Sequence, residues 1–278
     1  MASMKYVAVV GMVVVAIVAF VVGLYASPLV FPPVKGPEDP FWDRISESGT
    51  IIVGTEPGWP PYEFEDEDGN IIGFEVDIMN MIADDLDLEV DWRDMGFDNI
   101  ILAVQAGDID LGVSGFSVTS ERLEVMDFTM PHSITEGQIV MLQSKATEKG
   151  ITMLKSPANL TDYDITCGAQ VGTTQRNELN ELAPTQLQTY EDFLLALQAM
   201  KNGIIDSVYA ETPITSNWIL EAEQNGEPAI VVVYKRPYYP VAFIANKSAD
   251  TLVAKINGAL AEIIASGQLD ELRQKWKT

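Results

Sequence analysis

The stretch Ala103-Val-Gln-Ala-Gly107-Asp-Ile-Asp110-Leu-Gly-Val113 decides the fold, because its pattern occurs twice in the chain. The second copy is Leu197-Gln-Ala-Met-Lys-Asn-Gly203-Ile-Ile-Asp206-Ser-Val208. Each copy has a segment typical of a helix, a glycine where that helix would end, and an aspartate three residues later that leads into a strand. The copies lie too far apart for a solenoid repeat. They therefore predict two α/β lobes of similar design.

Strand and helix patterns alternate around the first copy. Apolar residues predict strands over residues 51–55, 88–92 and 111–114, and helices over 76–86 and 99–106. Alternating units of this kind predict a mostly parallel sheet covered by helices. Near the C-terminus, apolar stripes over 252–264 and 269–276 predict two further helices, separated at Gly267, that pack on the core.

Composition excludes several classes of function. The 278 residues include 17 basic and 41 acidic ones, and the net charge of −24 disfavours a nucleic-acid partner, which needs a basic face. This acidity is typical of a salty exterior or simply of a well-solvated surface. The single cysteine, Cys167, excludes an intramolecular disulfide, and the single histidine, His132, excludes a histidine-based metal cluster. We expect no cofactor and no metal.

The N-terminus predicts export from the cytoplasm. Lys5 precedes an uncharged run from Tyr6 to Tyr25, and about 20 such residues can span a bilayer as a helix. We interpret residues 1–26 as an uncleaved signal anchor; a signal peptide cleaved after Ala26 is the alternative, although Leu24 fits that site poorly. A proline-rich tether over 27–42 follows. In both cases the rest of the chain lies outside the cytoplasm, at the membrane face or free in the periplasm or medium.

Five segments occur in a fixed order in the remaining sequence. They are Ile52-Val-Gly-Thr-Glu-Pro-Gly-Trp-Pro-Pro-Tyr-Glu-Phe64, Gly73-Phe-Glu-Val-Asp77, Gly115-Phe-Ser-Val-Thr-Ser-Glu-Arg122 with Asp127-Phe-Thr129, Val171-Gly-Thr-Thr174, and Ala210-Glu-Thr-Pro213. Each segment alone is weak, but five in order are specific. With them, the chain from about Asp43 to Thr278 resembles the polar amino-acid family of periplasmic solute-binding proteins that serve ABC importers.

The resemblance implies an α/β, two-lobed, periplasmic-binding-protein-like (type II) fold that follows the N-terminal transmembrane or signal helix. Two hinge crossings are expected near His132–Glu136 and Lys235–Tyr239. Lobe 1 would comprise residues 43–133 plus 238–278, and lobe 2 residues 134–237. The resemblance also implies a monomer that binds a small amino acid between the lobes and delivers it to an ABC transporter permease.

The resemblance assigns the ligand's carboxylate to Arg122. A zwitterion that leaves water needs a partner for each charge, and a guanidinium grips a carboxylate with two parallel bonds. Ser117 and the Gly115 amide would complete this shell. Thr173 or Thr174 would reach it from lobe 2, at a helix start where free N–H groups favour anions. A plain helix N-cap is compatible with that role.

The ammonium is assigned to Glu211, where the family usually has aspartate. Trp59 and Phe97 resemble the aromatic walls that hold the ligand side chain. Glu56 takes the position that decides specificity, and with Gln170 it favours lysine, arginine, ornithine or histidine. Glutamine stays compatible, and a solvated loop acid is the plain alternative for Glu56. The implied ligand-binding residues are Glu56, Trp59, Phe97, Ser114, Gly115, Ser117, Arg122, Gln170, Thr173, Thr174 and Glu211.

Two rival functions stay open. A few proteins with this fold catalyse dehydration, and Glu56 or Glu211 could act as a general acid, since burial raises carboxyl pKa values. A sensor that signals through a partner is the other rival. We expect a binding protein without enzymatic activity. His132 and Cys167 are interpreted as structural, the second as an inert core residue.

Overall fold

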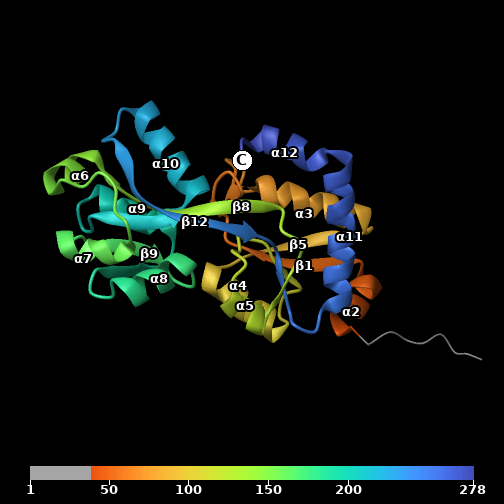
Figure 1. Ribbon diagram of the computed structural model, residues 1–278. Helices are drawn as coiled ribbons and strands as arrows, with labels where there is room; N and C mark the ends of the chain where they lie inside the picture. The colour runs from red at the N-terminus through yellow and green to blue at the C-terminus, as the bar shows by residue number, and fades with distance from the viewer. Residues whose placement is uncertain (1–38) are drawn as a thin grey trace, which may run out of the picture. The chain divides into compact units, whose positions relative to one another are not determined.

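The structure is a computed structural model that describes residues 39–278 (Figure 1). The predicted signal segment over 1–26 and residues 27–38 of the predicted tether lie outside the described residues. The tether prediction is wrong at its end, because Asp39 caps helix α2 (Pro40–Ser48) and the helix includes residues 40–42. Among residues 39–278, no helix combines the length and the apolar character that crossing a bilayer requires.

The described chain contains two separate five-stranded sheets (Figure 1). In order across the first sheet, the strands are β5 (Glu89–Asp94), β1 (Thr50–Thr55), β6 (Leu111–Gly112), β13 (Ile244–Ala245) and β7 (Asp127–Phe128). In order across the second, they are β10 (Leu187–Tyr190), β9 (Cys167–Gln170), β11 (Ser207–Glu211), β8 (Ser133–Leu142) and β12 (Ile230–Val241). A small antiparallel sheet joins β2 (Gly58–Trp59), β3 (Glu63–Glu65) and β4 (Ile71–Ile72).

Helices flank each sheet. Those that accompany the first sheet are α2 (Pro40–Ser48), α3 (Phe74–Asp85), α4 (Phe97–Ala106), α5 (Ser120–Val125), α11 (Asp250–Ser266) and α12 (Gln268–Trp276). Those that accompany the second are α6 (Gln143–Lys149), η1 (Pro157–Asn159), α7 (Leu160–Tyr163), α8 (Thr174–Leu182), α9 (Phe193–Lys201) and α10 (Thr212–Asn225). The predicted two-lobed α/β fold is confirmed. The predicted mostly parallel sheet is wrong, because β8, β12 and β13 pair antiparallel with their neighbours, so each five-stranded sheet has two parallel and two antiparallel strand pairs.

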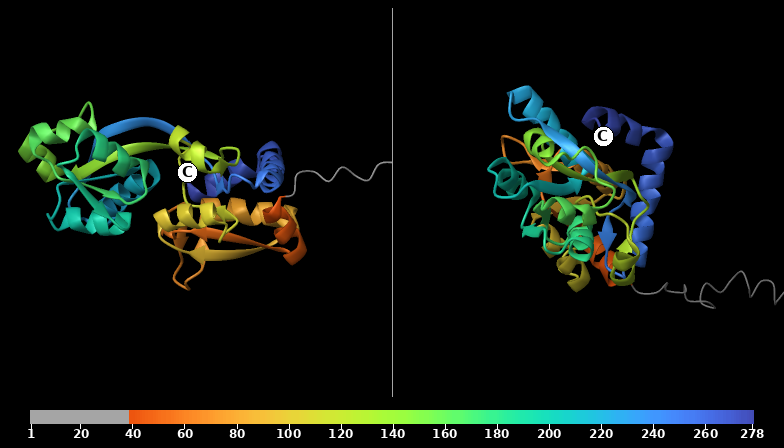
Figure 2. Two further views of the ribbon diagram at one scale, coloured as in Figure 1. Left: turned by 90° about the horizontal axis from the view of Figure 1, so that it is seen from below. Right: turned by 60° about the vertical axis from the view of Figure 1, so that its left-hand side comes forward.

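A two-stranded ribbon connects the lobes. Strands β8 and β12 pair antiparallel from Ser133–Val241 at one end to Leu142–Ile230 at the other. Figure 2 shows both strands running from the second sheet toward the first. Their register shifts between Lys235 and Tyr238, so the ribbon is irregular near one expected crossing. The predicted lobe boundaries at 133 and 238 fall at the start of β8 and inside β12.

The repeated sequence pattern performs the same structural task in both lobes. After α4, Gly107 has φ 77° and ends the helix, and Asp110 then accepts a hydrogen bond from the Ile52 amide at 2.9 Å. In the second copy, Asp206 accepts from the Thr166 amide at 2.9 Å. Each aspartate thus fixes a neighbouring strand start. The second helix ends slightly earlier than the pattern predicts, at Lys201.

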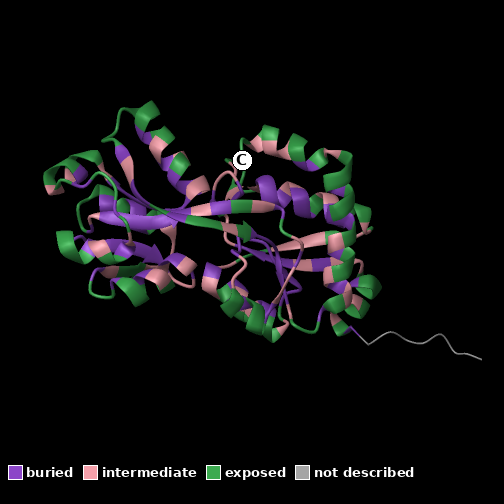
Figure 3. Cartoon of the chain, in the orientation of Figure 1, coloured by how far each residue is buried: buried purple, intermediate pink, exposed green. Residues whose placement is uncertain are grey.

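Buried side chains follow the strands of both sheets and the inner faces of the helices (Figure 3). Cys167 is fully buried and free, which confirms the core interpretation. His132 is also buried, where its Nε2 lies 2.7 Å from Glu75 Oε1 and its ring packs against Phe243. The structural interpretation of His132 is therefore confirmed.

Candidate ligand-binding site

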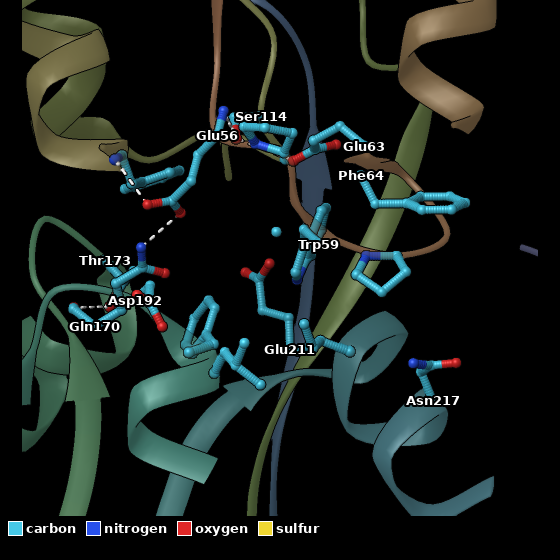
Figure 4. A pocket seen from close by; sticks show the side chains of 18 of the residues that line it. Glu56, Trp59, Glu63, Phe64, Ser114, Gln170, Thr173, Asp192, Glu211 and Asn217 are labelled. Carbon is cyan, nitrogen blue, oxygen red and sulfur yellow. Dashed lines mark hydrogen bonds between the residues drawn. The ribbon is translucent and has the colours of Figure 1, made fainter. Parts of the chain in front are cut away.

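A cavity of about 580 Å³ lies between the two sheets and is lined by residues of both lobes (Figure 4). All eleven residues that the sequence singled out for ligand binding line it. Most of them follow the carboxyl end of a strand or the start of a helix, where loops converge in α/β folds. Residues 56–59 follow β1, 114–117 follow β6, 173–174 open α8, and Glu211 ends β11.

Trp59 forms one wall of the cavity because Gly115 leaves room for it. Gly115 has φ 61°, and a Cβ at this position would come within 2.2 Å of the Trp59 ring. The ring is 6% exposed and packs against Tyr62 at 4.7 Å, yet its buried Nε1 has no hydrogen-bond partner. An apolar face with one free donor therefore borders the cavity.

Arg122 presents a buried cation to the cavity. Its guanidinium lies over Phe97 and Phe116, with ring centroids at 5.5 and 5.6 Å. Its Nη1 donates to the Ser117 carbonyl at 3.0 Å and its Nη2 to the Gly172 carbonyl at 3.1 Å. Burial lowers the pKa of Arg122 to about 10, which leaves it charged at neutral pH. No carboxylate among residues 39–278 lies within ion-pair distance of it, so an anion would complete its environment.

Glu211 presents the opposite charge nearby. Its Oε1 accepts a hydrogen bond from Ser117 Oγ at 2.9 Å and lies 3.9 Å from Arg236 Nη2. Figure 4 shows the carboxyl group directed into the open centre of the cavity. Burial raises the pKa of Glu211, and the Arg236 charge is the largest effect that opposes the rise. Gln175 also lines the cavity, with a buried and unpartnered Nε2.

Glu56 lies at the other end of the cavity and links the lobes. Its Oε1 accepts from the Phe97 amide at 3.2 Å, and its Oε2 accepts from Gln170 Nε2 at 2.6 Å. Burial raises the pKa of Glu56 to about 7, and the charges of Asp192 and Asp94 add to the rise. The structure brings Glu56 and Gln170, both singled out in the sequence, into contact. A cationic group between them and the nearby aspartates would stabilise the ionised carboxylate.

Two expected contacts differ from the structure. The Gly115 amide donates to Glu75 Oε2 at 2.9 Å, so it is not free for a ligand carboxylate here. Ser114 Oγ accepts from the Glu56 amide at 3.3 Å and donates to Glu63 Oε1 at 2.9 Å, so both hydrogen bonds of this hydroxyl are made within lobe 1. Sequence reasoning did not anticipate these pairs, because Glu63 and Glu75 come from other segments and meet these atoms only after folding.

Helix α8 begins with an N-cap residue, as the sequence around Thr173 allowed. Thr173 Oγ1 accepts from the Arg176 amide at 3.2 Å and donates to the Gln170 carbonyl at 2.7 Å. The N-cap interpretation of Thr173 is therefore confirmed. Thr174 Oγ1 accepts instead from Arg236 Nη1 at 3.0 Å, so a basic side chain of β12 reaches the same place.

The lining is strongly acidic. Seven carboxyl groups border the cavity, and Arg122 is the one basic residue among the described residues that line it. The carboxyl groups are those of Glu56, Glu63, Glu65, Asp94, Asp192, Glu211 and Glu221. Five of them were missed from the sequence, although Glu63 stands in the first quoted segment and Asp192 caps α9. Within residues 39–278, no cluster of histidine, cysteine or acidic side chains is arranged to hold a metal.

Comparisons with known proteins agree with this architecture. The E. coli K12 protein called ABC transporter arginine-binding protein 1 is 26% identical over 233 residues, which cover 83% of this chain and 92% of that protein. The structure of an ancestral arginine-binding protein bound to arginine superimposes with a TM-score of 0.72 at 31% identity, covering 82% of this chain and 98% of that one. An ancestral amino-acid-binding protein, described as a precursor of cyclohexadienyl dehydratase, gives 0.74 at 28%, with 86% and 99% covered.

A family model settles the relationship. The model for bacterial extracellular solute-binding proteins, family 3, matches residues 51–278, which span both sheets and the whole cavity. This chain belongs to the bacterial extracellular solute-binding proteins of family 3.

Proposed function

We propose that this protein binds a basic L-amino acid outside the cytoplasm and delivers it, as a monomer, to an ABC importer. One observation carries the proposal: a buried Arg122, which has no carboxylate partner among residues 39–278, and an inward-facing Glu211 line a cavity whose far end holds Glu56. An amino-acid zwitterion offers the matching pair of charges, and both would be paired after leaving water.

The acidic lining favours a cationic side chain. With seven carboxyl groups and one guanidinium around the cavity, a ligand of net positive charge is attracted and a ligand of net negative charge is repelled. A cation beside Glu56 would also replace the Gln170 hydrogen bond with a charge pair. The arginine-binding relatives support this choice. Glutamine is the competing ligand, since its amide can donate to Glu56.

Ligand-induced closure of the lobes is part of the proposal. Three contacts join opposite lobes beside the cavity: Glu56 to Gln170, Ser117 to Glu211, and Arg122 to the Gly172 carbonyl. These contacts would form in a closed arrangement that exchanges with an open one in the absence of ligand, and a ligand that touches both lobes would shift that equilibrium by its differential affinity. X-ray scattering should show compaction when the ligand is added; an unchanged radius of gyration would contradict closure.

Calorimetric titration with arginine, lysine, histidine, glutamine and glutamate tests the ligand class. We expect the basic amino acids to bind, and tight binding of glutamate without any response to arginine would refute the proposal. A thermal-shift screen is an independent check, because a ligand at 100 times its dissociation constant stabilises the native state by about 2.7 kcal/mol.

We also propose that the protein is not an enzyme, although one structural relative is a precursor of a dehydratase. Burial raises the pKa of both Glu56 and Glu211, so either could in principle hold a proton near a bound ligand. Mass spectrometry of arginine and of prephenate-like cyclohexadienes after long incubation should recover each unchanged. Conversion above the rate of a boiled control would overturn this part of the proposal.

The proposed place of action is the extracytoplasmic membrane face. The support is the apolar run over residues 6–25, which the sequence presents before the folded part. Fractionation of cells that express the full chain should find it with membranes, and deletion of residues 1–26 should release it. A full chain recovered entirely in the soluble exported fraction would favour cleavage instead.

A further inference from the structure

Arg236 is a buried arginine that sequence reasoning did not assign to the site. It lies on β12 within the irregular part of the hinge ribbon, between the register positions of Lys235 and Tyr238. It is 6% exposed, and its guanidinium stacks on Tyr239 at 4.4 Å. A buried cation at a hinge is costly unless its charge has a purpose there.

The contacts of Arg236 divide it between two acids. Its Nη1 donates to Thr174 Oγ1 at 3.0 Å and to Glu178 Oε2 at 3.4 Å. Its Nη2 lies 3.9 Å from Glu211 Oε1 and, like Nε, has no hydrogen-bond partner among the described residues. The Arg236 guanidinium therefore does not form a bidentate pair with the Glu178 carboxylate. A purely structural pair would be expected to use both nitrogens on one carboxylate.

Glu178 has other partners that reduce its share in this cation. The Tyr209 hydroxyl donates to its Oε2 at 2.6 Å, and the Tyr234 hydroxyl donates to its Oε1 at 3.3 Å. Both oxygens are thus already occupied by neutral donors. The Arg236 nitrogen that faces Glu211 is Nη2, and it has no hydrogen-bond partner among the described residues.

Gly137 opens the path from Arg236 to Glu211. Strands β11 and β12 lie on either side of β8, and Gly137 of β8 is the register partner of Glu211. A Cβ at Gly137 would lie 3.0 Å from Arg236 Nε, tighter than ordinary packing. The absence of a side chain at this residue lets the guanidinium cross the middle strand toward the cavity.

We infer that Arg236 is a positioning residue for the ligand's ammonium group: from the hinge strand, it keeps the Glu211 carboxylate ionised and directed into the cavity. The inference rests on the proposed function, in which Glu211 receives the ammonium. Both residues belong to the second sheet, so the pair persists whether the lobes are open or closed. Ser117, in contrast, reaches Glu211 only across the cleft.

The other charged groups around Glu211 are few. Arg122 from α5 also opposes the rise in the pKa of Glu211, but its effect is smaller than that of Arg236. Glu63 and Tyr62 of lobe 1 face the same space; burial is the main cause that raises the pKa of each, and the negative charge of Glu211 adds a smaller part. Removing Arg236 should therefore leave Glu211 protonated over a wider pH range, and a neutral carboxyl pairs poorly with an ammonium.

The first test needs no ligand. Carboxyl-carbon NMR of the full-length chain, labelled at glutamate and assigned with Glu211→Gln, follows the titration of Glu211 in the wild type, Arg236→Met and Arg236→Lys. We expect the midpoint to rise by at least about one pH unit in Arg236→Met and by less in Arg236→Lys. An identical midpoint in the wild type and in both variants overturns the inference.

The second test uses L-arginine as the probe. The dissociation constant of Arg236→Met relative to the wild type should increase several-fold from pH 8 to pH 5.5, toward a limit of about tenfold for each unit of midpoint shift, whereas a structural defect would give a pH-independent ratio. Arg93→Gln is the matched control, because Arg93 is exposed and Asp91 is its one ion-pair partner in the described part of the chain. If the wild type fails to bind L-arginine, the proposed ligand class is wrong, while the NMR titration still decides the role of Arg236.

Discussion

The preference for arginine over glutamine should depend on pH, because Glu56 carries a different charge in the two complexes. Burial raises the pKa of Glu56 from its ordinary value of 4.5 to about 7. A neutral amide beside it leaves that pKa raised, so the glutamine complex holds a proton on Glu56 below neutral pH. The guanidinium of arginine stabilises the carboxylate and returns its pKa to the ordinary value or below.

The size of the effect follows from these two values. As the pH rises toward 7, removing the Glu56 proton, which arginine binding requires, costs less free energy, so arginine binding strengthens, whereas glutamine binding leaves the pKa of Glu56 raised and does not change. Linkage gives this group a preference for arginine of about fourfold at pH 5 and about 300-fold at pH 8. The ratio of the two dissociation constants should therefore change by about 70-fold, or ~2.5 kcal/mol, in the direction of arginine.

Calorimetric titrations of both ligands from pH 5 to pH 8 measure this ratio. The ligands share their carboxylate and ammonium, so the titration of Glu211 and Glu63 largely cancels. Glu56→Gln removes the titrating group and should make the ratio flat. A wild-type ratio that varies by less than about threefold, or an equal slope in Glu56→Gln, would refute the reasoning.

Three further perturbations are informative. Arg122→Ala should weaken ligand binding by about 2–5 kcal/mol with an unchanged circular dichroism spectrum, because the ligand carboxylate loses its buried partner; binding within twofold of the wild type would contradict this. Gly115→Ala should lower ligand affinity, and it should lower the free energy of unfolding by about 1–3 kcal/mol, because the new methyl group displaces Trp59. Gly258→Ala is the control: it has free space around it and should lower neither quantity. Gln170→Ala removes a bond to a carboxylate worth about 1.5–3 kcal/mol across the cleft, so the ligand-free protein should show a larger radius of gyration; an unchanged value would mean that this bond does not hold the lobes together.

Short sequence patterns predicted the α/β architecture because helix ends and strand starts require particular residue types. Gly107 must end a helix in the left-handed conformation, and Asp110 and Asp206 each stand beside the strand start that they stabilise. The helix end at Gly107 depends on a few neighbouring residues and is visible in one sequence. The hydrogen bonds of Asp110 and Asp206 join residues 58 and 40 positions apart, and the repetition of the pattern was their only sign in the sequence. One of the five ordered segments contains Glu56 and another begins directly after Gln170, so the resemblance implied that both residues line one cavity.

The missing parts of the site depend on contacts between distant segments. Nothing near Arg236 in the sequence indicates that its guanidinium will cross β8 beside Gly137 and approach Glu211. The donation of the Gly115 amide to Glu75 was likewise invisible, since it joins residues that come together only in the folded lobe. The packing of distant segments determines such pairs, and the spacing of apolar residues along the sequence does not indicate them.

The position of β13 has a consequence for the order in which the protein folds during synthesis. In the first sheet, β13 (Ile244–Ala245) lies between β6 and β7, although it is made more than a hundred residues after them. The second sheet uses only one continuous stretch, from Ser133 to Val241, whose two ends are hydrogen-bonded neighbours. The inserted lobe can therefore complete its sheet as it leaves the ribosome, while the lobe whose first part was synthesised earlier has an open edge at β6 until β13 arrives.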